Sequence, residues 1–290
     1  MMKFQRFAVA VFAAIILPGA TLLASDDAEA ERELGWSITA DLSFILTAGN
    51  SQSTTLGFDG TTSHESEKAL LEIRFGALNV ETTTDLDVAV GTPEDFTILE
   101  VKETTAETLF LAGKYNRDIS DRLFWYAGAG WLRNEPAGIR NRYLISGGVG
   151  NNWRDTERFS FRTNYGASYT DQQNLVEIPL VATSFPGVAL SSVLTKALGK
   201  NRAEYGNIFL FNYSLADSEN WRWNMEQWIS SSVTDRLSLK ATLTWLFNNV
   251  PAFREIALLE GNPPTDQGNS VLVQLEKLDT IFSVSLVVDF

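Results

Sequence analysis

The 290-residue sequence predicts an all-β protein, a transmembrane antiparallel up-and-down β-barrel, and three observations lead to this fold class. Long segments alternate apolar and polar residues, which gives each segment one apolar face. These segments run for about 10 to 14 residues, whereas a soluble strand typically has about 5 to 6 and a tilted strand needs about 9 to 11 to cross a bilayer. The last such segment carries its apolar face to the terminal Phe290.

The composition hides this pattern, because alternating strands mix lipid-facing and polar residues within one segment. Hydrophobic residues make up 44% of the chain, as in an ordinary globular protein. The absence of cysteine excludes disulfides, cysteine-based zinc sites and a lipid attached through an N-terminal cysteine. The net charge is −13, and because an acidic surface repels phosphate backbones we expect no nucleic-acid partner.

Residues 1–30 predict a cleavable secretory signal peptide. Lys3 and Arg6 form a positive start, and a long apolar run follows them. Small residues that suit signal peptidase come next, with cleavage after Ala24 or after Ala30 as the two alternatives. We therefore expect export, and a final location in the outer membrane of a Gram-negative bacterium.

Residues 31–290 are expected to form the barrel. Eleven segments alternate clearly, at 36–48, 53–64, 69–82, 101–116, 123–134, 140–153, 158–172, 203–216, 221–233, 236–249 and 277–290. Bacterial barrels have an even number of strands, with short periplasmic turns and longer outer loops. We expect twelve strands, the additional one lying between 172 and 203, where Val188 to Leu198 alternates weakly. Ten and fourteen strands are the alternatives, and Gly187 to Gly199 could instead form a short loop helix.

The connections give the barrel a direction. Residues that favour tight turns predict short periplasmic turns at 116–122, 154–158 and 234–236. The third turn has the right direction only if a strand is added before residue 203. The long segments then become extracellular loops, at 83–99, 173–187 and 250–276.

Aromatic residues gather near the ends of the expected strands, as in the girdles that mark the two membrane interfaces. They are Trp36, Trp131, Trp153, Trp221, Trp223, Trp245 and Phe247. A soluble sandwich would also alternate, but it would not need long strands that carry aromatic residues at their ends.

The inward positions carry charges of both signs. They are Asp41, Asp59, Glu72, Arg74, Arg162, Glu226 and Lys240, with Arg142 and Arg222 added by the same alternation. A channel for anions would favour a ladder dominated by arginine or lysine, whereas mixed buried charges tend to pair. We interpret the interior as a salt-bridged, hydrated core, with a narrow or gated channel as the alternative.

An acidic cluster lies in the first long loop. Eight acidic residues stand between Glu81 and Glu107 against only Lys102. Carboxylate oxygens suit divalent cations, so this loop could share such cations with lipopolysaccharide. The alternative is a merely solvated loop, because no calcium-loop spacing occurs.

A hydrolase would need a histidine beside a serine, oriented by a third polar group. The only histidine, His64, is flanked by Ser63, Glu65 and Ser66. It falls at the turn between the second and third expected strands, on the periplasmic side, and it has the lipid-facing register of its strand. We therefore interpret His64 as a turn residue and expect no enzyme activity.

The sequences of the turns resemble a known family. The opening Gly35-Trp36, Leu42 and Thr47-Ala48-Gly49-Asn50-Ser51, followed by a serine- and threonine-rich return strand, is similar to the salt-induced outer-membrane proteins of YdiY type. Ser232 to Lys240, Asn249-Val250-Pro251 and Lys277 to Thr280 resemble later parts of that family. The resemblance implies an integral outer-membrane barrel linked to salt or osmotic stress, and its motifs are turns without catalytic residues.

The sequence thus predicts a structural or envelope-stress barrel, with a narrow channel for small hydrophilic solutes as the alternative and a hydrolase as a weaker one. We expect no catalytic residue, no cofactor and no metal. The expected partners are outer-membrane lipids, lipopolysaccharide and the barrel assembly machinery, which would recognise the last strand through Phe290.

Overall fold

The computed structural model describes residues 34–47, 53–80, 84–92, 95–103, 106–135, 137–177, 183–199, 203–234, 236–260 and 265–289. The expected signal peptide over residues 1–30 and the terminal Phe290 lie outside these ranges. The described residues form sixteen strands: β1 (Gly35–Thr47), β2 (Ser53–Ser66), β3 (Ala69–Val80), β4 (Thr84–Thr92), β5 (Asp95–Glu103), β6 (Ala106–Asp118), β7 (Leu123–Asn134), β8 (Ile139–Thr156), β9 (Phe159–Asn174), β10 (Ser184–Leu198), β11 (Ala203–Ser214), β12 (Trp221–Thr234), β13 (Leu237–Asn248), β14 (Phe253–Glu260), β15 (Thr265–Gln274) and β16 (Leu278–Asp289).

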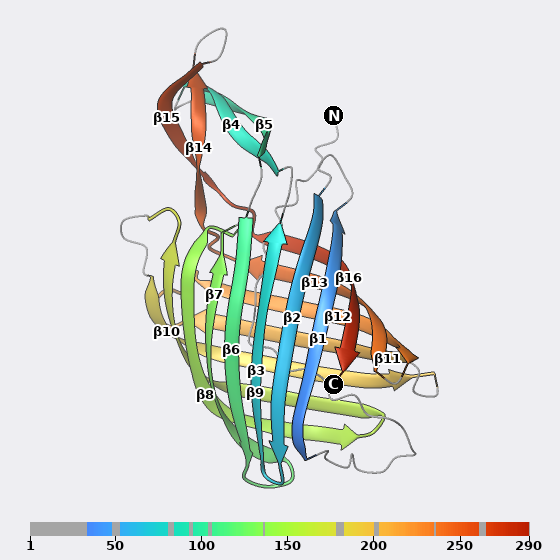
Figure 1. Ribbon diagram of the computed structural model, residues 1–290. Coiled ribbons are helices and arrows are strands. Elements are labelled where there is room, and N and C mark those ends of the chain that lie inside the picture. Colours follow the sequence, from blue (N-terminus) through green and yellow to red (C-terminus); the bar gives the residue numbers. More distant parts are fainter. Residues whose placement is uncertain are drawn as a thin grey trace.

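Twelve of these strands close into a barrel in the order β1-β16-β13-β12-β11-β10-β9-β8-β7-β6-β3-β2 (Figure 1). Each pair of neighbours is antiparallel, and the barrel closes where β1 pairs with β16, with Thr39 opposite Asp289. The prediction of an all-β, antiparallel, twelve-stranded barrel is confirmed.

The strand expected between residues 172 and 203 is β10. It pairs with β9 on one side, where Leu190 lies opposite Tyr165, and with β11 on the other, where Leu190 lies opposite Phe211. β10 begins at Ser184, so the connection after β9 is shorter than the loop expected over 173–187. The alternative of a loop helix over Gly187 to Gly199 was wrong.

The long connections lie at one end of the barrel, and the connections at the other end are short turns. The described short turns are 67–68, 119–122 and 157–158, together with the connection between β12 and β13. In the turn at 119–122 the backbone N–H of Leu123 donates to Ser120 Oγ at 3.2 Å. The predicted turns over 116–122 and 154–158 were too wide, because the ladders of β6 and β8 continue to Asp118 and Thr156.

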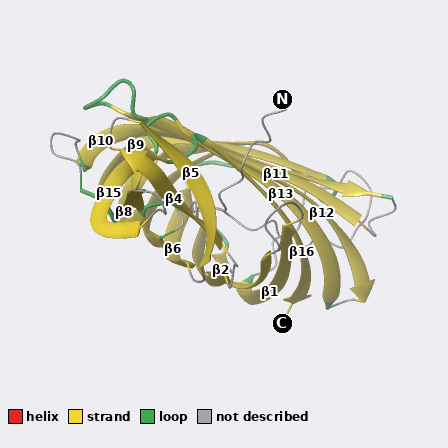
Figure 2. Ribbon diagram, turned by 90° about the horizontal axis from the view of Figure 1, so that it is seen from above, coloured by secondary structure: helices red, strands yellow, loops and turns green. Residues whose placement is uncertain are grey.

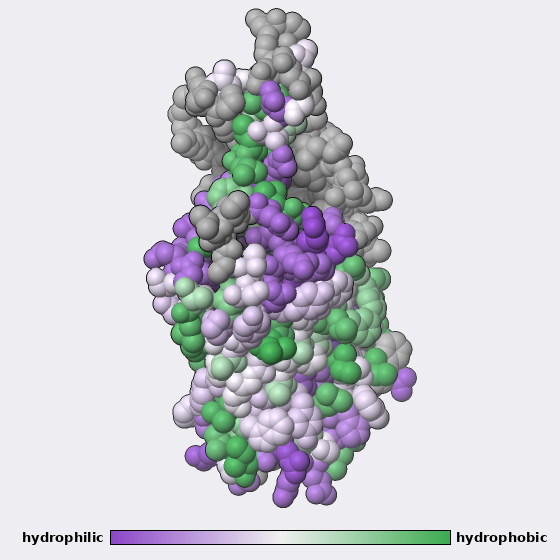
Figure 3. Space-filling model, turned by 90° about the vertical axis from the view of Figure 1, so that its left-hand side faces the viewer, coloured by the Kyte–Doolittle hydropathy of each residue, from purple (hydrophilic) through white to green (hydrophobic). Residues whose placement is uncertain are grey.

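The outer wall is apolar and exposed. Large apolar side chains face outward around the barrel, among them Ile38, Leu42, Phe58, Phe75, Leu111, Ile145, Val149, Leu190, Ile229, Leu239, Val284 and Leu286. In the face shown in Figure 3, hydrophilic residues gather at the two ends of the barrel, with a paler and greener wall between them. Such a belt is expected of a wall surrounded by lipid.

Aromatic residues lie toward both ends of this wall. Trp36 and Trp153 are exposed near the short turns. At the other end Trp221 stacks on Phe247, with ring centroids 4.9 Å apart, and Trp223 stacks on the same ring at 5.8 Å. The predicted concentration of aromatic residues near the strand ends is therefore present at both ends of the barrel wall.

No helix among the described residues is long and apolar enough to cross a membrane.

A second, smaller sheet lies above the mouth of the barrel, which is the end where the long connections lie (Figures 1 and 2). Its order is β15-β14-β4-β5, and β14 pairs with β4 in parallel, with Leu258 opposite Ala89. Ala89, Ile256 and Leu258 form its buried centre, against which Val271 and Val273 pack.

This sheet corrects two expectations. The segments expected as loops over 83–99 and 250–276 contain β4, β14, β15 and part of β5. The single strand expected over 101–116 is divided between β5 of the small sheet and β6 of the barrel. The prediction of loops over 83–99 and 250–276 was therefore wrong, and the sequence does not show that the chain changes sheets within 101–116.

The small sheet should unfold independently of the barrel. Leu258 is fully buried in it, whereas Leu272 on β15 is 53% exposed. Because an unpaired buried charge is costly, Leu258→Asp is expected to make residues 253–274 sensitive to limited proteolysis while the folded barrel keeps its heat-modifiable gel migration. Leu272→Asp is the matched control and should leave the sheet protected. Equal sensitivity in both variants would contradict this account of the centre of the sheet.

Candidate functional site in the barrel interior

The inward side chains are packed together instead of lining an open space. The barrel strands alternate, and the inward residues of most of them include groups that are almost completely buried. The most buried are Thr108, Phe124, Leu132, Asn134, Ile139, Asn164, Thr170, Ile208 and Ser214, all at 3% exposure or less. A barrel of this size has room for water, so the burial shows that side chains occupy that room.

The inward charges form ion pairs between strands, either adjacent or one strand apart. Arg74 donates hydrogen bonds to Asp59 Oδ2 from two nitrogens, from Nε at 2.9 Å and from Nη2 at 2.6 Å. Lys240 Nζ lies 3.4 Å from Asp41 Oδ2, across the seam where the barrel closes. These pairs place four of the predicted inward charges inside the barrel, and a two-point guanidinium–carboxylate contact is among the stronger polar contacts.

A glycine, an aromatic ring and a cation form a recurring stack on the inner wall. Phe110 lies over Gly76, Phe124 over Gly150 and Trp228 over Gly206, so close that a Cβ on the glycine would meet the ring at 1.9 to 2.3 Å. A cation then covers each ring at 5.5 or 5.6 Å: Arg74 covers Phe110, Arg162 covers Phe124 and Lys240 covers Trp228.

In each stack the ring lies against the backbone of the neighbouring strand, at the glycine directly opposite it. Glycine occurs in strands where another group approaches the backbone closely, and each cation–π contact contributes about 0.5–2 kcal/mol. The stacks therefore cover the inner wall with aromatic rings and hold the cations in place.

Glu72 and Lys114 form the centre of the lower half. They lie opposite each other on β3 and β6, both are buried, and Lys114 Nζ lies 4.9 Å from the centre of the Tyr126 ring. Arg162, which donates from Nε to Asn152 Oδ1 at 2.8 Å, adds a further cation to this layer. Nothing in this arrangement resembles the like-signed ladder of a selective channel.

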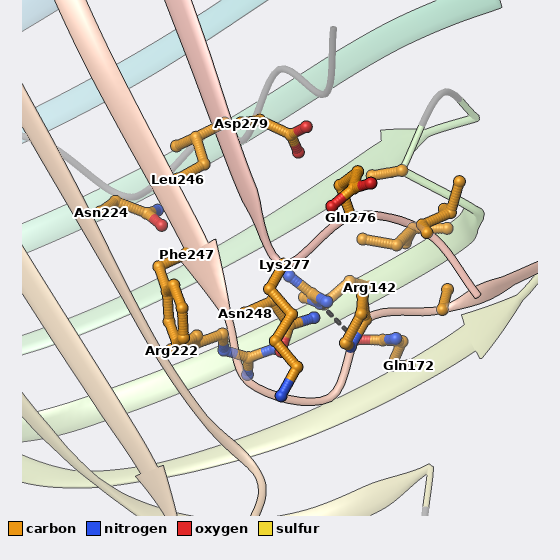
Figure 4. Close-up of a pocket in the computed structure, with 15 residues that line it drawn as sticks. Arg142, Gln172, Arg222, Asn224, Leu246, Phe247, Asn248, Glu276, Lys277 and Asp279 are labelled. Carbon is orange, nitrogen blue, oxygen red and sulfur yellow. Dashed lines mark hydrogen bonds between the residues drawn. The ribbon is translucent and has the colours of Figure 1, made fainter. Parts of the chain in front are cut away.

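The lumen contains two cavities that share several lining residues. The larger has a volume of about 100 Å³ and extends between β6–β8 and β10–β12; the smaller, of about 40 Å³, lies beneath the mouth. Arg142, Arg222 and Asn224 line both. The smaller cavity is also lined by Gln172, Asn248, Glu276, Lys277 and Asp279, which Figure 4 shows converging from several strands and connections.

The alternation correctly identified the inward charges, including buried Arg142 and Arg222. It missed Lys114, although Lys114 shares its parity with buried Ala112 and Asn116. It also missed Asp279, which was read only as part of a turn motif, and Glu204, which accepts a hydrogen bond from Trp228.

His64 does not lie in a turn, because β2 continues to Ser66. Its ring meets the Trp36 ring edge to face, with centroids 4.8 Å apart, on the outer face of the barrel. Ser63 points to the opposite face of the strand by alternation, so the neighbouring serine and histidine cannot act as a pair. The expectation that the chain is not an enzyme remains a prediction.

Among the described residues, no group of three or more His, Asp or Glu side chains is placed to hold a metal ion. The acidic side chains between Glu81 and Glu107 lie outside the described side chains.

Three solved structures illustrate the comparison with known folds. The anion-selective porin from Comamonas acidovorans matches with a TM-score of 0.38 and 10% identity, over 88% of this chain and 98% of the porin. The translocator domain of the autotransporter NalP from Neisseria meningitidis matches at 0.40 and 10%, over 89% and 90%. OmpT, an outer-membrane protein of Vibrio cholerae, matches at 0.38 and 9%, over 93% and 100%.

No curated protein matches the sequence. A family model, described as "Protein of unknown function, DUF481", matches residues 40–290, which is the barrel together with the small sheet. The chain therefore belongs to the DUF481 family of proteins of unknown function.

Proposed function

We propose that this chain is an exported, integral outer-membrane barrel whose interior is closed by side chains, so that it serves the envelope as a structural barrel and not as an open pore. The belt of exposed apolar residues, with aromatic residues toward both ends, supports insertion in a bilayer. The short turns at one end and long connections at the other support an orientation with the turns in the periplasm.

The burial of charged inward groups is the observation that carries the closed interior. Glu72 and Lys114 are 4% and 7% exposed although both face the lumen. In a water-filled pore such side chains would extend into solvent. Their burial, together with the ion pairs and ring stacks around them, supports a filled barrel whose charges neutralise one another.

The likeness of the turn sequences to salt-induced outer-membrane proteins supports a role in salt or osmotic stress. The partners that follow are outer-membrane lipids, lipopolysaccharide and the barrel assembly machinery, which would bind the strand ending at Phe290. A strain without the gene should grow normally in ordinary medium and more slowly at raised osmolarity. Equal growth of the two strains under both conditions would count against the stress role.

The closed interior predicts that the refolded protein gives no stable single-channel steps in planar bilayers. The variant Lys114→Ala/Tyr126→Ala removes the contact between the Lys114 cation and the Tyr126 ring, in which Nζ lies 4.9 Å from the ring centre. It should admit water and give small ion currents that the native protein does not. The measurement is conductance at fixed salt and voltage, with heat-modifiable migration as the check that both barrels are folded.

A narrow channel is the second candidate, favoured by the two cavities in the lumen. Stable, saturable steps from the native protein would establish it and would refute the closed barrel. The membrane location is tested separately: the native protein should fractionate with the outer membrane, and recovery as a soluble periplasmic protein would contradict it.

A further inference from the structure

The smaller cavity, beneath the mouth, is lined by side chains of opposite charge that do not pair with one another (Figure 4). Asp279 and Glu276 bring two carboxylates to its lining, and Arg222 brings a guanidinium group. Within the described part of the chain, no ion pair joins Arg222 to either carboxylate. Arg222 is 8% exposed, so its charge is removed from bulk water although an acidic wall stands in the same cavity.

The strand ladder places these opposite charges on the two sides of β13. Arg222 on β12 lies opposite Asn248, and Asp279 on β16 lies opposite Leu246. Neighbouring strands lie about 4.7–4.9 Å apart, so β12 and β16 are separated by roughly 10 Å across the sheet. The short aspartate side chain cannot cross that separation, and a direct ion pair would require the arginine to reach over β13.

The side chain of Arg222 extends in the other direction. Its Nη2 donates to Thr170 Oγ1 on β9 at 3.2 Å, and its guanidinium carbon lies 5.7 Å from the centre of the Phe185 ring on β10. In the barrel order β9 and β10 lie on one side of β12, whereas β13 and β16 lie on the other. These contacts therefore hold the cation apart from Asp279, and they bring no negative charge to it.

The acidic side of the cavity carries two like charges. Asp279 experiences the negative charge of Glu276, and a cation placed beside both would relieve that repulsion. Lys277 lines the same cavity, but it is exposed and its Nζ donates to Asn249 Oδ1 at 3.1 Å. A positive group on a bound solute would supply the charge that these two carboxylates lack.

The volume of the cavity suits a small solute. About 40 Å³ is room for roughly three water molecules, and a small amino acid fills about that space. Asn224 and Asn248 add amide groups to the lining, and the adjoining cavity of about 100 Å³ shares Asn224 and Arg222. Arg142 also lines both cavities; its Nε donates to Gln172 Oε1 at 2.6 Å, and no contact with the solute is assigned to it.

We propose that this cavity binds a small zwitterionic solute of the amino acid class, with its carboxylate on Arg222 and its ammonium group on Asp279 and Glu276. The planar guanidinium group presents paired donors that match a carboxylate, and the ammonium group donates to the two acidic side chains. A simple anion or a simple cation would satisfy only one side of the cavity. Binding requires no passage through the barrel, so the site is independent of whether the protein conducts.

The test is equilibrium binding to the full chain refolded in detergent micelles, at neutral pH and constant ionic strength. Glycine and γ-aminobutyrate, which hold their two charges at different separations, are titrated and followed by ¹³C NMR. Acetate and methylammonium each carry one of the two charges and are titrated separately. The better of the two zwitterions should bind at least about tenfold more tightly than acetate or methylammonium.

Two variants remove one charge each from opposite sides of the cavity. Arg222→Gln and Asp279→Asn should each weaken binding of the zwitterion about tenfold or more. Arg122→Gln and Asp121→Asn are the matched controls, because they make the same chemical changes at exposed positions of a short turn, outside both cavities. Both controls should bind as the native protein does, and heat-modifiable gel migration checks that every variant is folded.

Preferential binding of either zwitterion, weakened in both cavity variants and kept in both controls, supports the site, and the preferred chain length reports how far apart its charged sides lie. The site is overturned if neither zwitterion binds, if acetate or methylammonium binds as tightly, if Asp279→Asn binds as the native protein does, or if the controls lose binding equally. If Arg222→Gln does not fold, Asp279→Asn and Glu276→Gln, at less buried positions, decide the question. The titration measures binding and not conductance, so its failure leaves the closed barrel untouched.

Discussion

Replacing Trp228 with alanine is expected to lower the free energy of unfolding of the barrel by about 3–5 kcal/mol. Trp228 packs inside the lumen against Ile208, with Val193 and Leu210 beside them. Strands held by a closed ladder cannot collapse into the space that the indole leaves, so the loss combines transfer and cavity terms. A denaturant titration of the protein refolded in lipid vesicles measures the change.

Gly206 supplies the control for this substitution. A Cβ at Gly206 would lie 1.9 Å from the Trp228 ring, so Gly206→Ala should cost about 1–3 kcal/mol in the native background, as other overpacked sites do. In the Trp228→Ala background the same change should cost little, because the ring is gone. An equal cost in both backgrounds would show that the ring does not lie over Gly206.

The size of the Trp228→Ala effect also bears on the interior as a whole. In a water-filled lumen an indole would be solvated on one side, and its removal would leave no empty space. A near-neutral result would therefore contradict the closed barrel, independently of any conductance measurement.

The barrel strands could be predicted from the sequence because lipid on one side and a polar interior on the other impose a strict period of two. Even β10 could be placed, although Val193 on its inner face and Ser192 on its outer face blur the alternation. The direction of the turn at 234–236 required a strand before residue 203, and β10 supplies it.

The small sheet could not be predicted in the same way. Its key contact is the parallel pairing of Leu258 with Ala89, two residues far apart in the chain with nothing between them that indicates the pairing. The acidic residues between Glu81 and Glu107 also favoured a solvated loop over a strand. The alternation of β4 and β5 was present, but a period of two does not tell which sheet a strand joins.

The candidate site shows a similar limit. Alternation identifies Arg142 and Arg222 as inward residues, but their meeting on β9 depends on how far long side chains reach across the lumen. The hydrogen bond from Arg222 to Thr170 crosses from β12 to β9, and no spacing along the sequence encodes it. Contacts within neighbouring strands can be predicted from the sequence, whereas contacts across the lumen require the structure.

Replacing Ile145 with arginine is expected to destabilise the barrel in lipid vesicles by about 2–4 kcal/mol, the cost of a cation near the midplane of a bilayer. Ile145 lies on the outer face, opposite Ala129 near the middle of β7, and is 58% exposed. In a protein surrounded by water, a residue so exposed would accept arginine with almost no change in stability. The measurement is the free energy of unfolding in vesicles of defined lipid.

Ile119 makes the comparison specific to the membrane, because it is 57% exposed but lies in the short turn at 119–122. Ile119→Arg makes the same chemical change at the same exposure and should alter the free energy of unfolding by less than about 1 kcal/mol, since cations near the interface cost little. The difference between the two variants therefore isolates the hydrocarbon around the wall from any effect of the substitution itself. Equal, small effects at both positions would mean that water and not lipid covers Ile145, and the outer-membrane proposal would fail with it.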